Sequence, residues 1–370
     1  MKKVNPIIKW WVTPKLPLDD VFAKHNFISQ WITHPVKRRL AKWYLSYLKA
    51  ITDIKVIGIT GSAGKTTTKE MLASILKLDG KTVYSSKNVD SVYNIPNTIL
   101  KTPPGTKYLI LEMGVEYPGE MDFYLWLAKP DIGVITNIFP THIEYLKNEE
   151  GVLKEKSKLV LNLSENSAAV LNSTNTDIKK LAEKIKAKVI WIPKNSDPLA
   201  QNAFTAATVA DYLGINIETI KRGLSEYKKP EHRLSFIAHK SGAVIFDDTY
   251  NSNPKALIAS LGMFIEKAGG HPKIAVIGDM LELGKNEEEL HREVGKEVAK
   301  KDFQVVIGVG KASSYLIKEI KKRNKYTKTY LVESSDKVLP ILTPSLYKGA
   351  YIFIKGSRSI GLDKLVDELS

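Results

Sequence analysis

Short apolar runs recur along most of the chain, and a segment with helical spacing of apolar residues follows each one. From residue 55 the first series of runs reads KVIGIT, KTVYSS, KYLILEMG, DIGVITNI, SAAVLN and KVIWI. After the helical stretch PLAQNAFTAATVADYLG, a second series reads GAVIFDDTY, KIAVIGDM, FQVVIGVG, KTYLVES and AYIFIKGS. This alternation is typical of mostly parallel sheets flanked by helices. The pattern therefore predicts an α/β protein with two such domains.

The segment YKKPEH, residues 227–232, interrupts the periodicity with a proline and a cluster of charges. It is the predicted linker. We expect a short basic, aromatic-rich segment over residues 1–50, a central domain over 51–229 and a C-terminal α/β domain over 230–370. A chain of 370 residues is long enough for two or three domains.

Composition narrows the class of protein. The chain has no cysteine, so disulfides and thiolate metal sites are excluded. No run approaches the roughly 18 apolar residues that a membrane span needs. The N-terminus also lacks the apolar core and cleavage site of a secretory signal. We therefore expect a cytoplasmic protein, and a monomer.

The net charge of +15 is unevenly spread. Residues 1–50 hold ten Lys or Arg, two Asp and four of the six tryptophans, which gives this segment a net charge of +8. Basic residues mixed with Trp, Leu and Ile suit a surface that lies on anionic lipid. They equally suit a small helical cap that packs its aromatic side chains on the next domain. Nucleic-acid binding is not expected, because no nucleic-acid motif accompanies the charge.

The stretch GITGSAGKTTTKE, residues 58–70, directly follows the first apolar run and opens a helical segment. Its glycines fall at every third position and lead into a lysine and three threonines. The usual P-loop has a glycine six positions before the lysine, where this chain has Ile59. A tight turn would also use glycines, but this lysine and threonine content favours a phosphate cradle. The predicted cradle comprises Gly61, Ser62, Ala63, Gly64, Lys65, Thr66 and Thr67.

Residues at further strand ends match the needs of a nucleotide bound with metal. Lys65 would supply positive charge and Thr66 a hydroxyl for Mg²⁺. Glu112 ends LILEMG, and Asn137 and His142 lie just past GVITN. Taken singly, the glutamate would cap a helix and the histidine would be solvated. Because parallel strands gather their ligands at one edge of the sheet, we expect these residues to converge and hold one or two Mg²⁺ ions.

Five motifs occur in order: GITGSAGKTTTKEML, LEMGVEYPGEM, ITNIFPTHIEYL, DDTYNSNP and VIGDMLELG with a later histidine. Together they resemble the Mur ligases, closest to the MurF branch, over roughly residues 54–370. Mur ligases use the spacing G-x-x-G-x-x-G-K-T, which accounts for the shifted glycine. The resemblance implies a central P-loop ATPase-like domain with a mostly parallel sheet and a C-terminal Rossmann-like α/β domain. It also implies an ATP-dependent ligase that forms an acyl phosphate.

The resemblance gives roles to individual residues. Lys156, in GVLKEKSKLV, matches the family lysine that carries a carbamate and helps to bind the second of two Mg²⁺ ions; the alternative is a solvated, charged helix face. The metal set implied is Thr66, Glu112, His142 and Lys156. The catalytic set implied is Lys65, Glu112, His142, Lys156 and Arg233. Further nucleotide contacts implied are Asn137, Asn202, Arg233, Asp248, Tyr250 and Asn251.

Three features depart from the family pattern. Only about 50 residues precede the first strand, fewer than an ordinary domain needs, so the usual uridine-nucleotide domain is not expected. Gln201 replaces the histidine of the His-Asn motif near adenine. In KNVDSVYNIPNTIL, which resembles the segment that helps to receive the muramyl peptide, four family residues are replaced. These replacements are Lys87, Asp90, Ser91 and Asn94.

Three classes of function stay open. The MurF branch joins D-alanyl-D-alanine to a UDP-N-acetylmuramoyl tripeptide, so small-molecule and peptide substrates of peptidoglycan synthesis are expected. A second class is a Mur-type amide ligase that acts on polyglutamate or another amino-acid polymer. A third is a non-catalytic nucleotide-binding or membrane-tethering protein. The third class is disfavoured because the residues for ATP chemistry are all present.

Overall fold

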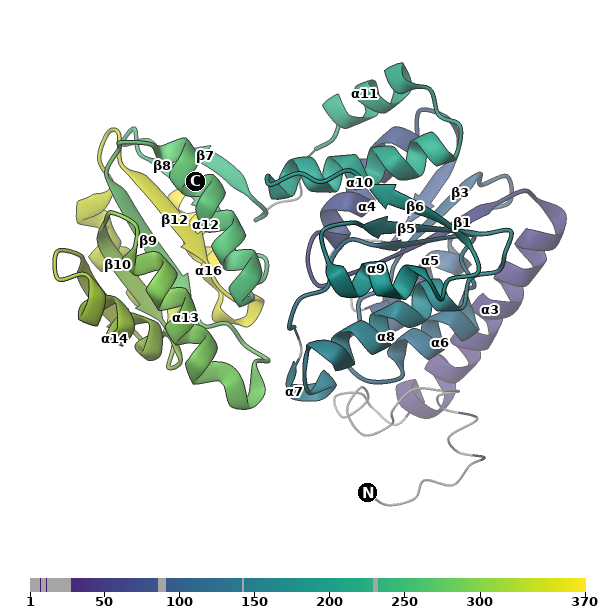
Figure 1. The fold of residues 1–370 in the computed structure, drawn as a ribbon, viewed down its shortest axis with the longest axis horizontal. Coiled ribbons are helices and arrows are strands. Elements are labelled where there is room, and N and C mark those ends of the chain that lie inside the picture. Colours follow the sequence, from purple (N-terminus) through teal and green to yellow (C-terminus); the bar gives the residue numbers. More distant parts are fainter. Residues whose placement is uncertain (1–6, 8–10, 12–27, 86–90, 142, 229–231) are drawn as a thin grey trace. The chain divides into compact units, whose positions relative to one another are not determined.

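The computed structural model describes residues 7, 11, 28–85, 91–141, 143–228 and 232–370 (Figure 1). The chain forms two compact units, Met1–Lys228 and Lys229–Ser370. None of the helices in the described ranges is long and apolar enough to cross a membrane.

The first unit is built on one sheet of six parallel strands. The strands are β1 (Lys55–Thr60), β2 (Thr82–Tyr84), β3 (Tyr108–Glu112), β4 (Ile132–Ile135), β5 (Ala168–Asn172) and β6 (Lys188–Ile192). Their order in the sheet is β2-β3-β1-β4-β5-β6. Every neighbouring pair is parallel, so all carboxyl ends lie at the same edge. Helices cover both faces of the sheet, and its central strands are therefore continuous apolar runs.

Two groups of helices cover the first sheet. The helices are α4 (Lys65–Leu76), α5 (Ser91–Leu100), α6 (Glu120–Leu127), α7 (Ile143–Leu146), α8 (Glu149–Leu161), α9 (Thr176–Ala182), α10 (Pro198–Tyr212) and α11 (Ile217–Ser225). The apolar faces of α4, α10 and α11 pack together on one side of the sheet. On the other side α8 contacts β1 and β4, and α5 contacts β3. A preceding helix, α3 (His34–Ile51), follows a π-helical turn (Ser29–Thr33) and packs on α5 and α6.

The second unit has a sheet of six strands with one antiparallel edge. The strands are β7 (Ser235–Ala238), β8 (Val244–Asp247), β9 (Lys273–Gly278), β10 (Phe303–Val309), β11 (Lys328–Val332) and β12 (Tyr351–Lys355). The order is β11-β10-β9-β12-β8-β7, and only the β7–β8 pair is antiparallel. This edge strand was not predicted: it is short and partly exposed, so its sequence lacks a continuous apolar run. Each run that the sequence predicted as a strand is one.

Helices also cover both faces of the second sheet. They are α12 (Pro254–Ala268), α13 (Glu287–Ala299), α14 (Ser313–Arg323), α15 (Leu339–Leu342) and α16 (Leu362–Leu369), with 3₁₀ turns at Gly284–Asn286, Ser335–Lys337, Thr343–Ser345 and Arg358–Ile360. The first three of these helices bury an aromatic core, including Phe246, Phe264 and Phe353, on one face. The last two cover the opposite face. The predicted fold class is confirmed.

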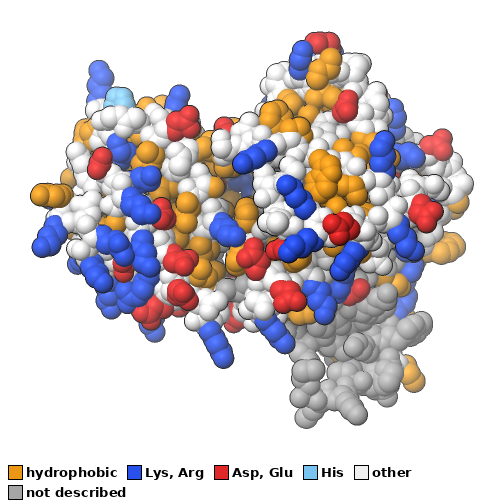
Figure 2. Space-filling model, viewed as in Figure 1, with side chains coloured by type: hydrophobic (Ala, Val, Ile, Leu, Met, Phe, Trp, Pro, Cys, Tyr) orange, Lys and Arg blue, Asp and Glu red, His pale blue; other side chains and the backbone are white. Residues whose placement is uncertain are grey.

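Basic side chains are spread over the surface of each unit, and acidic side chains are interspersed among them (Figure 2). On the second unit, Lys and Arg gather over α14, where the helix ends in a basic run. Cations in the last turn interact favourably with the helix dipole. This basic run therefore has a local structural reason.

Candidate active site

The loop between β1 and α4 is a tight, glycine-dependent turn. Gly61 has a φ of 147° and Gly64 a φ of 79°, values that L side chains rarely adopt. A Cβ on Gly61 would lie 2.0 Å from Thr136 Oγ1, and one on Gly64 would lie 2.3 Å from Asn202 Oδ1. The N-cap residue of α4 is Gly64, which has no side chain that could cap the helix. The turn thus places backbone N–H groups and a helix N-terminus together, as phosphate-binding loops do.

Residues that follow β4 hold this loop in place. Asn137 Oδ1 accepts a hydrogen bond from Ala63 N at 2.7 Å, and its Nδ2 donates to Ala63 O at 3.0 Å. Ser62 N donates to Asn137 O at 3.0 Å. The Ser62 hydroxyl also donates to Phe139 O and accepts from Phe139 N. Asn137, predicted to contact the nucleotide, therefore also shapes the cradle.

The first residues of α4 bring an amine, a hydroxyl and a carboxylate together. Lys65 Nζ donates to Gly61 O at 2.9 Å, so its amine lies at the loop. Thr66 Oγ1 donates to Glu112 Oε1 at 2.8 Å. Glu112 is the last residue of β3, the strand beside β1, so the sheet itself determines this meeting. Amine, hydroxyl and carboxylate groups are the ones that nucleotide phosphates and Mg²⁺ require.

Lys69 supports the carboxylate and was missed in the sequence. This side chain is fully buried, donates to Ser85 O at 2.8 Å and lies 3.3 Å from Glu112 Oε2. Ser85 Oγ in turn accepts from Glu112 N at 2.7 Å. The signal for it was helical spacing: Lys69 falls three residues after Thr66, on the same face of α4.

Lys156, on α8, is fully buried, and its Nζ has no hydrogen-bond partner among the described residues. Burial first, and then the positive charge of Lys65, lower the pKa of Lys156 to about 7. Glu120, Glu116 and Glu155 act in the opposite direction. A solvated charged face, the alternative from the sequence, is therefore wrong for this lysine.

The other lysines of α8 have different surroundings. Lys154 is exposed. Lys158 Nζ lies 2.6 Å from both Asp122 Oδ2 and Glu155 Oε2. Asn148 caps the start of this helix, because its side chain accepts from the backbone N–H three residues later. The sequence LKEKSK alone does not distinguish these environments, because three closely spaced lysines can face solvent, a carboxylate pair or the protein interior.

The predicted metal set is only partly visible. His142 lies outside the described residues. Within the described ranges no three His, Cys, Asp or Glu side chains cluster closely enough to hold a metal ion. The oxygen donors brought together are the Thr66 hydroxyl and the Glu112 carboxylate. Lys156, the other described residue of the predicted metal set, contributes a fully buried amine.

Asn202, on α10, supports the cradle from outside. It is 7% exposed, and its Oδ1 accepts from Thr68 Oγ1 at 3.4 Å. Gln201, which replaces the family histidine, has another partner set. Its Oε1 accepts from Asn195 N at 2.7 Å and its Nε2 donates to Pro193 O at 3.0 Å. Gln201 thus holds the turn before α10.

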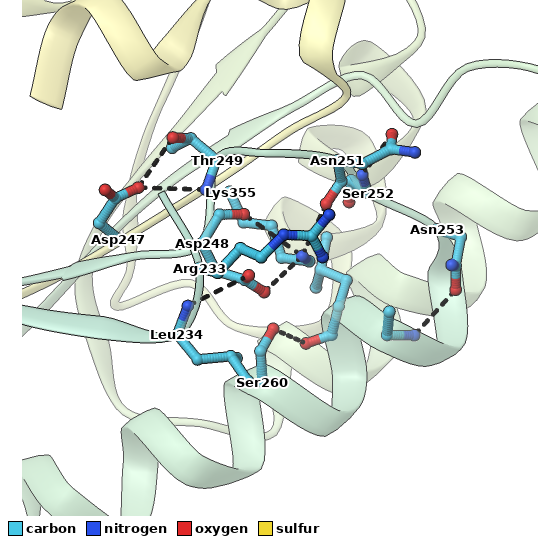
Figure 3. A network of polar contacts seen from close by, with 12 residues as sticks. Arg233, Leu234, Asp247, Asp248, Thr249, Asn251, Ser252, Asn253, Ser260 and Lys355 are labelled. Atoms are coloured by element: carbon cyan, nitrogen blue, oxygen red, sulfur yellow. Dashed lines mark hydrogen bonds and ion pairs between the residues drawn. The ribbon is translucent and has the colours of Figure 1, made fainter. Parts of the chain in front are cut away.

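A second polar cluster lies in the second unit, where β8 and β12 end (Figure 3). Lys355 is 2% exposed and forms an ion pair with Asp248. Its Nζ also donates to Asn251 O at 2.9 Å. The Arg233 guanidinium lies over the Tyr250 ring, 3.7 Å from its centroid. The structure thus brings all four predicted second-unit residues together, around a lysine that the sequence analysis missed.

Arg233 is held between two strained residues. His232 has a φ of 60° and Leu234 a φ of 47°. Non-glycine residues in this region cost on the order of 1–3 kcal/mol each, and such strain concentrates at functional sites. His232 Nδ1 lies 3.0 Å from Asp247 Oδ2, and Leu234 N donates to Asp248 Oδ1 at 3.4 Å. These contacts hold the turn that carries Arg233 in its strained conformation.

Two quoted motifs contain residues with structural roles. Asn253 caps the start of α12, because its Oδ1 accepts from Ala256 N at 2.9 Å. Asp279, in VIGDM, accepts from Ser313 N at 2.6 Å at the start of α14. His291 is fully buried and binds the loop that follows Asp279. These motifs therefore identify the family through residues that stabilise the second unit.

Comparison with known proteins decides the family. Residues 59–229 match the Mur ligase middle domain, and residues 232–358 match the domain described as "Mur ligase, glutamate ligase domain". A UDP-N-acetylmuramoyl-tripeptide--D-alanyl-D-alanine ligase of Buchnera aphidicola is 32% identical over 382 residues, covering 93% of this chain and 81% of the relative. The chain belongs to the Mur ligase family. Its resemblance to the MurF branch is confirmed.

Two solved structures share the fold of this Mur ligase. MurF from Acinetobacter baumannii has a TM-score of 0.81 at 24% identity, covering 91% of this chain and 80% of that chain. MurF ligase from Thermotoga maritima, solved in complex with ADP, has a TM-score of 0.79 at 23% identity, covering 91% and 83%. Both likenesses show that the fold is shared.

Proposed function

We propose that this Mur ligase is an ATP-dependent, ADP-forming amide ligase of the MurF type. Its substrates are D-alanyl-D-alanine and a UDP-N-acetylmuramoyl tripeptide, so its product is a peptidoglycan precursor. The observation that carries this proposal is the glycine-dependent cradle, in a chain that is similar to a ligase of this name over four-fifths of that relative's length. The ADP bound to the Thermotoga maritima neighbour supports the use of ATP. We place the enzyme in the cytoplasm as a monomer.

The reaction needs two steps. The acceptor carboxylate attacks the γ-phosphorus of ATP, forming an acyl phosphate and releasing ADP. The amine of the dipeptide then attacks the carbonyl carbon, phosphate leaves, and the amine loses a proton. Negative charge develops on oxygen in both steps, so electrostatic stabilisation is the main contribution expected of the protein.

The first unit supplies this stabilisation. We assign the phosphates to the backbone of Gly61–Gly64 and to the Lys65 amine. Thr66 and Glu112 would hold Mg²⁺, which neutralises phosphate charge when it is bound. Lys69 keeps the carboxylate of Glu112 oriented. His142 stays a proposed metal ligand.

Lys156 is proposed to carry a carbamate. With a pKa of about 7, the amine is neutral above that pH and can attack CO₂, which yields a carbamate anion and releases one proton. The buried amine makes no hydrogen bond with the described residues, so forming the carbamate breaks none. The carbamate anion would offer two oxygens to a second Mg²⁺. The lysine's burial beside the charge of Lys65 supports this assignment.

The second unit is proposed to bind the nucleotide as well. Arg233 is the charged group for the phosphates, and Tyr250 holds it by stacking. Asp248 and Asn251 are fixed by Lys355, so the loop that they form is preorganised. Asn202 is proposed as the first-unit residue near the adenine.

A second candidate function keeps the ATP chemistry and changes the acceptor. Two of the replaced residues in the acceptor segment are described, and both have structural roles. Ser91 Oγ accepts from Gly114 N at 2.9 Å, and Asn94 is buried with its Oδ1 accepting from Thr98. Lys87 and Asp90 lie outside the described residues. This different segment favours a Mur-type ligase on another amino-acid polymer as the alternative.

A phosphate-release assay tests the proposal. The purified chain is incubated with ATP, Mg²⁺ and pairs of acceptors and amines, including UDP-N-acetylmuramoyl tripeptide with D-alanyl-D-alanine, and polyglutamate with glutamate. Release that requires the first pair supports the MurF-type function. Release only with the second pair supports the alternative, and no release with any pair overturns both.

A further inference from the structure

The outer face of α3 carries a continuous row of exposed apolar side chains. Trp43 is the most exposed of them, at 76%. At about 100° per residue these positions fall within an arc of about 80°, which is one narrow face of the helix. We call this row the outer stripe; it consists of Val36, Leu40, Trp43, Tyr47 and Ile51.

The opposite face of α3 attaches the helix firmly to the first unit. Ala41, Leu45 and Leu48 are buried where α3 packs on α5 and α6. Tyr44 Oη donates to Thr102 O at 2.7 Å. Ala41, Leu45, Leu48 and Tyr44 thus make contacts of α3 with the rest of the unit, whereas Trp43 faces outward. The outer stripe is not needed for this packing.

The helix that carries the stripe has a net positive charge. The sequence of α3, HPVKRRLAKWYLSYLKAI, has five basic residues and no acidic one. Lys37 and Arg39 flank the stripe and are partly exposed. The other three point away from it: Arg38 is buried, Lys42 lies over the Trp126 ring, 4.4 Å from its centroid, and Lys49 pairs with Asp131. Residues 1–50 as a whole have a net charge of +8. Each Lys or Arg near an anionic bilayer contributes on the order of 1 kcal/mol of attraction.

We propose that α3 lies on an anionic phospholipid surface, with the outer stripe inserted between headgroups and the basic residues beside it. A Trp and a Tyr among aliphatic residues are typical of interfacial helices. A second copy of the chain fits the stripe less well, because a symmetric contact would bring two equally positive segments together. An anionic membrane offers the opposite charge. The proposal is independent of which acceptor the ligase uses.

Vesicle sedimentation of the full chain tests this proposal. The vesicles contain phosphatidylcholine with or without about one third phosphatidylglycerol, at about 0.05 M and about 0.5 M salt. We expect binding that requires phosphatidylglycerol and weakens at the higher salt. The stripe variant Leu40→Ser/Trp43→Ser/Tyr47→Ser should bind about tenfold or more weakly.

A control variant removes three partly exposed apolar side chains elsewhere on the first unit. The control variant is Trp191→Ser/Phe204→Ser/Tyr212→Ser, whose three side chains are 36–42% exposed. It should bind vesicles like the unchanged protein. Both variants should keep the phosphate-release activity in solution, since neither touches the cradle. If the stripe variant fails to fold, Trp43→Ser alone should still weaken vesicle binding severalfold.

Three outcomes would overturn the proposal. One is an unchanged protein that does not bind anionic vesicles at all. Another is a stripe variant that binds as well as the control variant. The third is an unchanged protein that is a dimer by light scattering and becomes a monomer in the stripe variant, which would assign the stripe to a second copy. Loss of ligase activity in the panel assay, with vesicle binding kept, would overturn only the proposed function.

Discussion

Each unit has a loop that leads from a strand through a glycine into a helix, and the two loops differ in how the start of that helix is bonded. In the first unit β1 leads through GSAGKTTT into α4, and in the second β10 leads through GKASS into α14. Both turns use a glycine in the left-handed region, Gly64 with φ 79° and Gly310 with φ 103°. The N-cap residue of α4 is Gly64, which has no side chain that could cap the helix. At α14 the carboxylate of Asp279 accepts from Ala312 N at 3.1 Å and from Ser313 N at 2.6 Å.

The difference lies in the neighbouring strand. Each loop receives an acidic residue from the strand beside it: Glu112 ends β3, and Asp279 follows β9. The longer glutamate bonds to the Thr66 hydroxyl, whereas the shorter aspartate bonds to the helix backbone itself. A Cβ on Gly310 would lie 2.4 Å from Asp279 Oδ2, so the carboxylate fills the space of that turn. A strand, a glycine and a lysine therefore do not suffice for an anion site.

The largest expected effect contrasts the two lysines that follow these glycines. Lys65→Ala should lower ligase turnover on the order of 10³-fold, because it removes positive charge from the transferring phosphoryl group. Lys311→Ala, at the matching place in the second loop, should change turnover less than about twofold. Steady-state phosphate release measures both. Similar losses in the two variants would contradict the distinction between the loops.

The next largest effect tests the carbamate that we propose on Lys156. Lys156→Ala should lower turnover on the order of 10²-fold, because the proposed carbamate is lost. Acetate should restore part of the activity by supplying a carboxylate at the same place. The exposed neighbour provides the control, and Lys154→Ala should be close to unchanged. Full activity of Lys156→Ala would show that no carbamate is needed.

A smaller effect is expected where the second loop is filled. Asp279→Ala should lower the free energy of unfolding of the second unit by about 2 kcal/mol, because buried N–H groups lose a charged acceptor. Urea denaturation followed by circular dichroism measures this loss. Asp302→Ala, at an exposed aspartate, is the control and should cost less than about 0.5 kcal/mol. Equal stabilities would mean that the carboxylate is not a structural cap.

The smallest effect concerns His291, which holds the loop after Asp279. Its Nε2 accepts from Met280 N at 3.1 Å, and burial lowers the pKa of this histidine below its ordinary value of 6.5. As the pH falls, His291 is therefore protonated at a higher pH in the unfolded chain than in the folded protein. Stability is kept above pH 6.5 and declines below it, by at most about 1.4 kcal/mol per pH unit.

His291→Gln should remove this part of the pH dependence, because glutamine can accept the same hydrogen bond without titrating. Denaturation midpoints between about pH 7 and about pH 5 measure the difference from the unchanged protein. His271→Gln, at an exposed histidine, should leave the pH profile as it was. A profile of His291→Gln that matches the unchanged protein would contradict the assignment.

The fold and the cradle were predictable because each has a local signature. Apolar runs mark strands buried on both faces, and the glycine rhythm marks a turn that only glycine tolerates. Lys69 and Lys355 are different, since their roles depend on burial by segments far away in the chain, and Lys156 was named only through the family resemblance. In sequence they look like ordinary surface lysines. The motif around Asp279 shows the same limit, because an acidic residue after a strand can bind a ligand or cap a neighbouring helix.

The short connection between α3 and β1 would determine how the phosphate loop is oriented relative to a membrane. Only residues 52–54 separate the two elements. Asp131 accepts from Lys49 Nζ at 3.0 Å and from Val56 N at 2.8 Å, so one carboxylate binds both sides of the join. A chain held on lipid through α3 would thus keep the phosphate loop at one height and one tilt above the bilayer. Substrates would then reach the phosphate loop from one fixed direction. A few glycines inserted between α3 and β1 would abolish that orientation while leaving both elements intact.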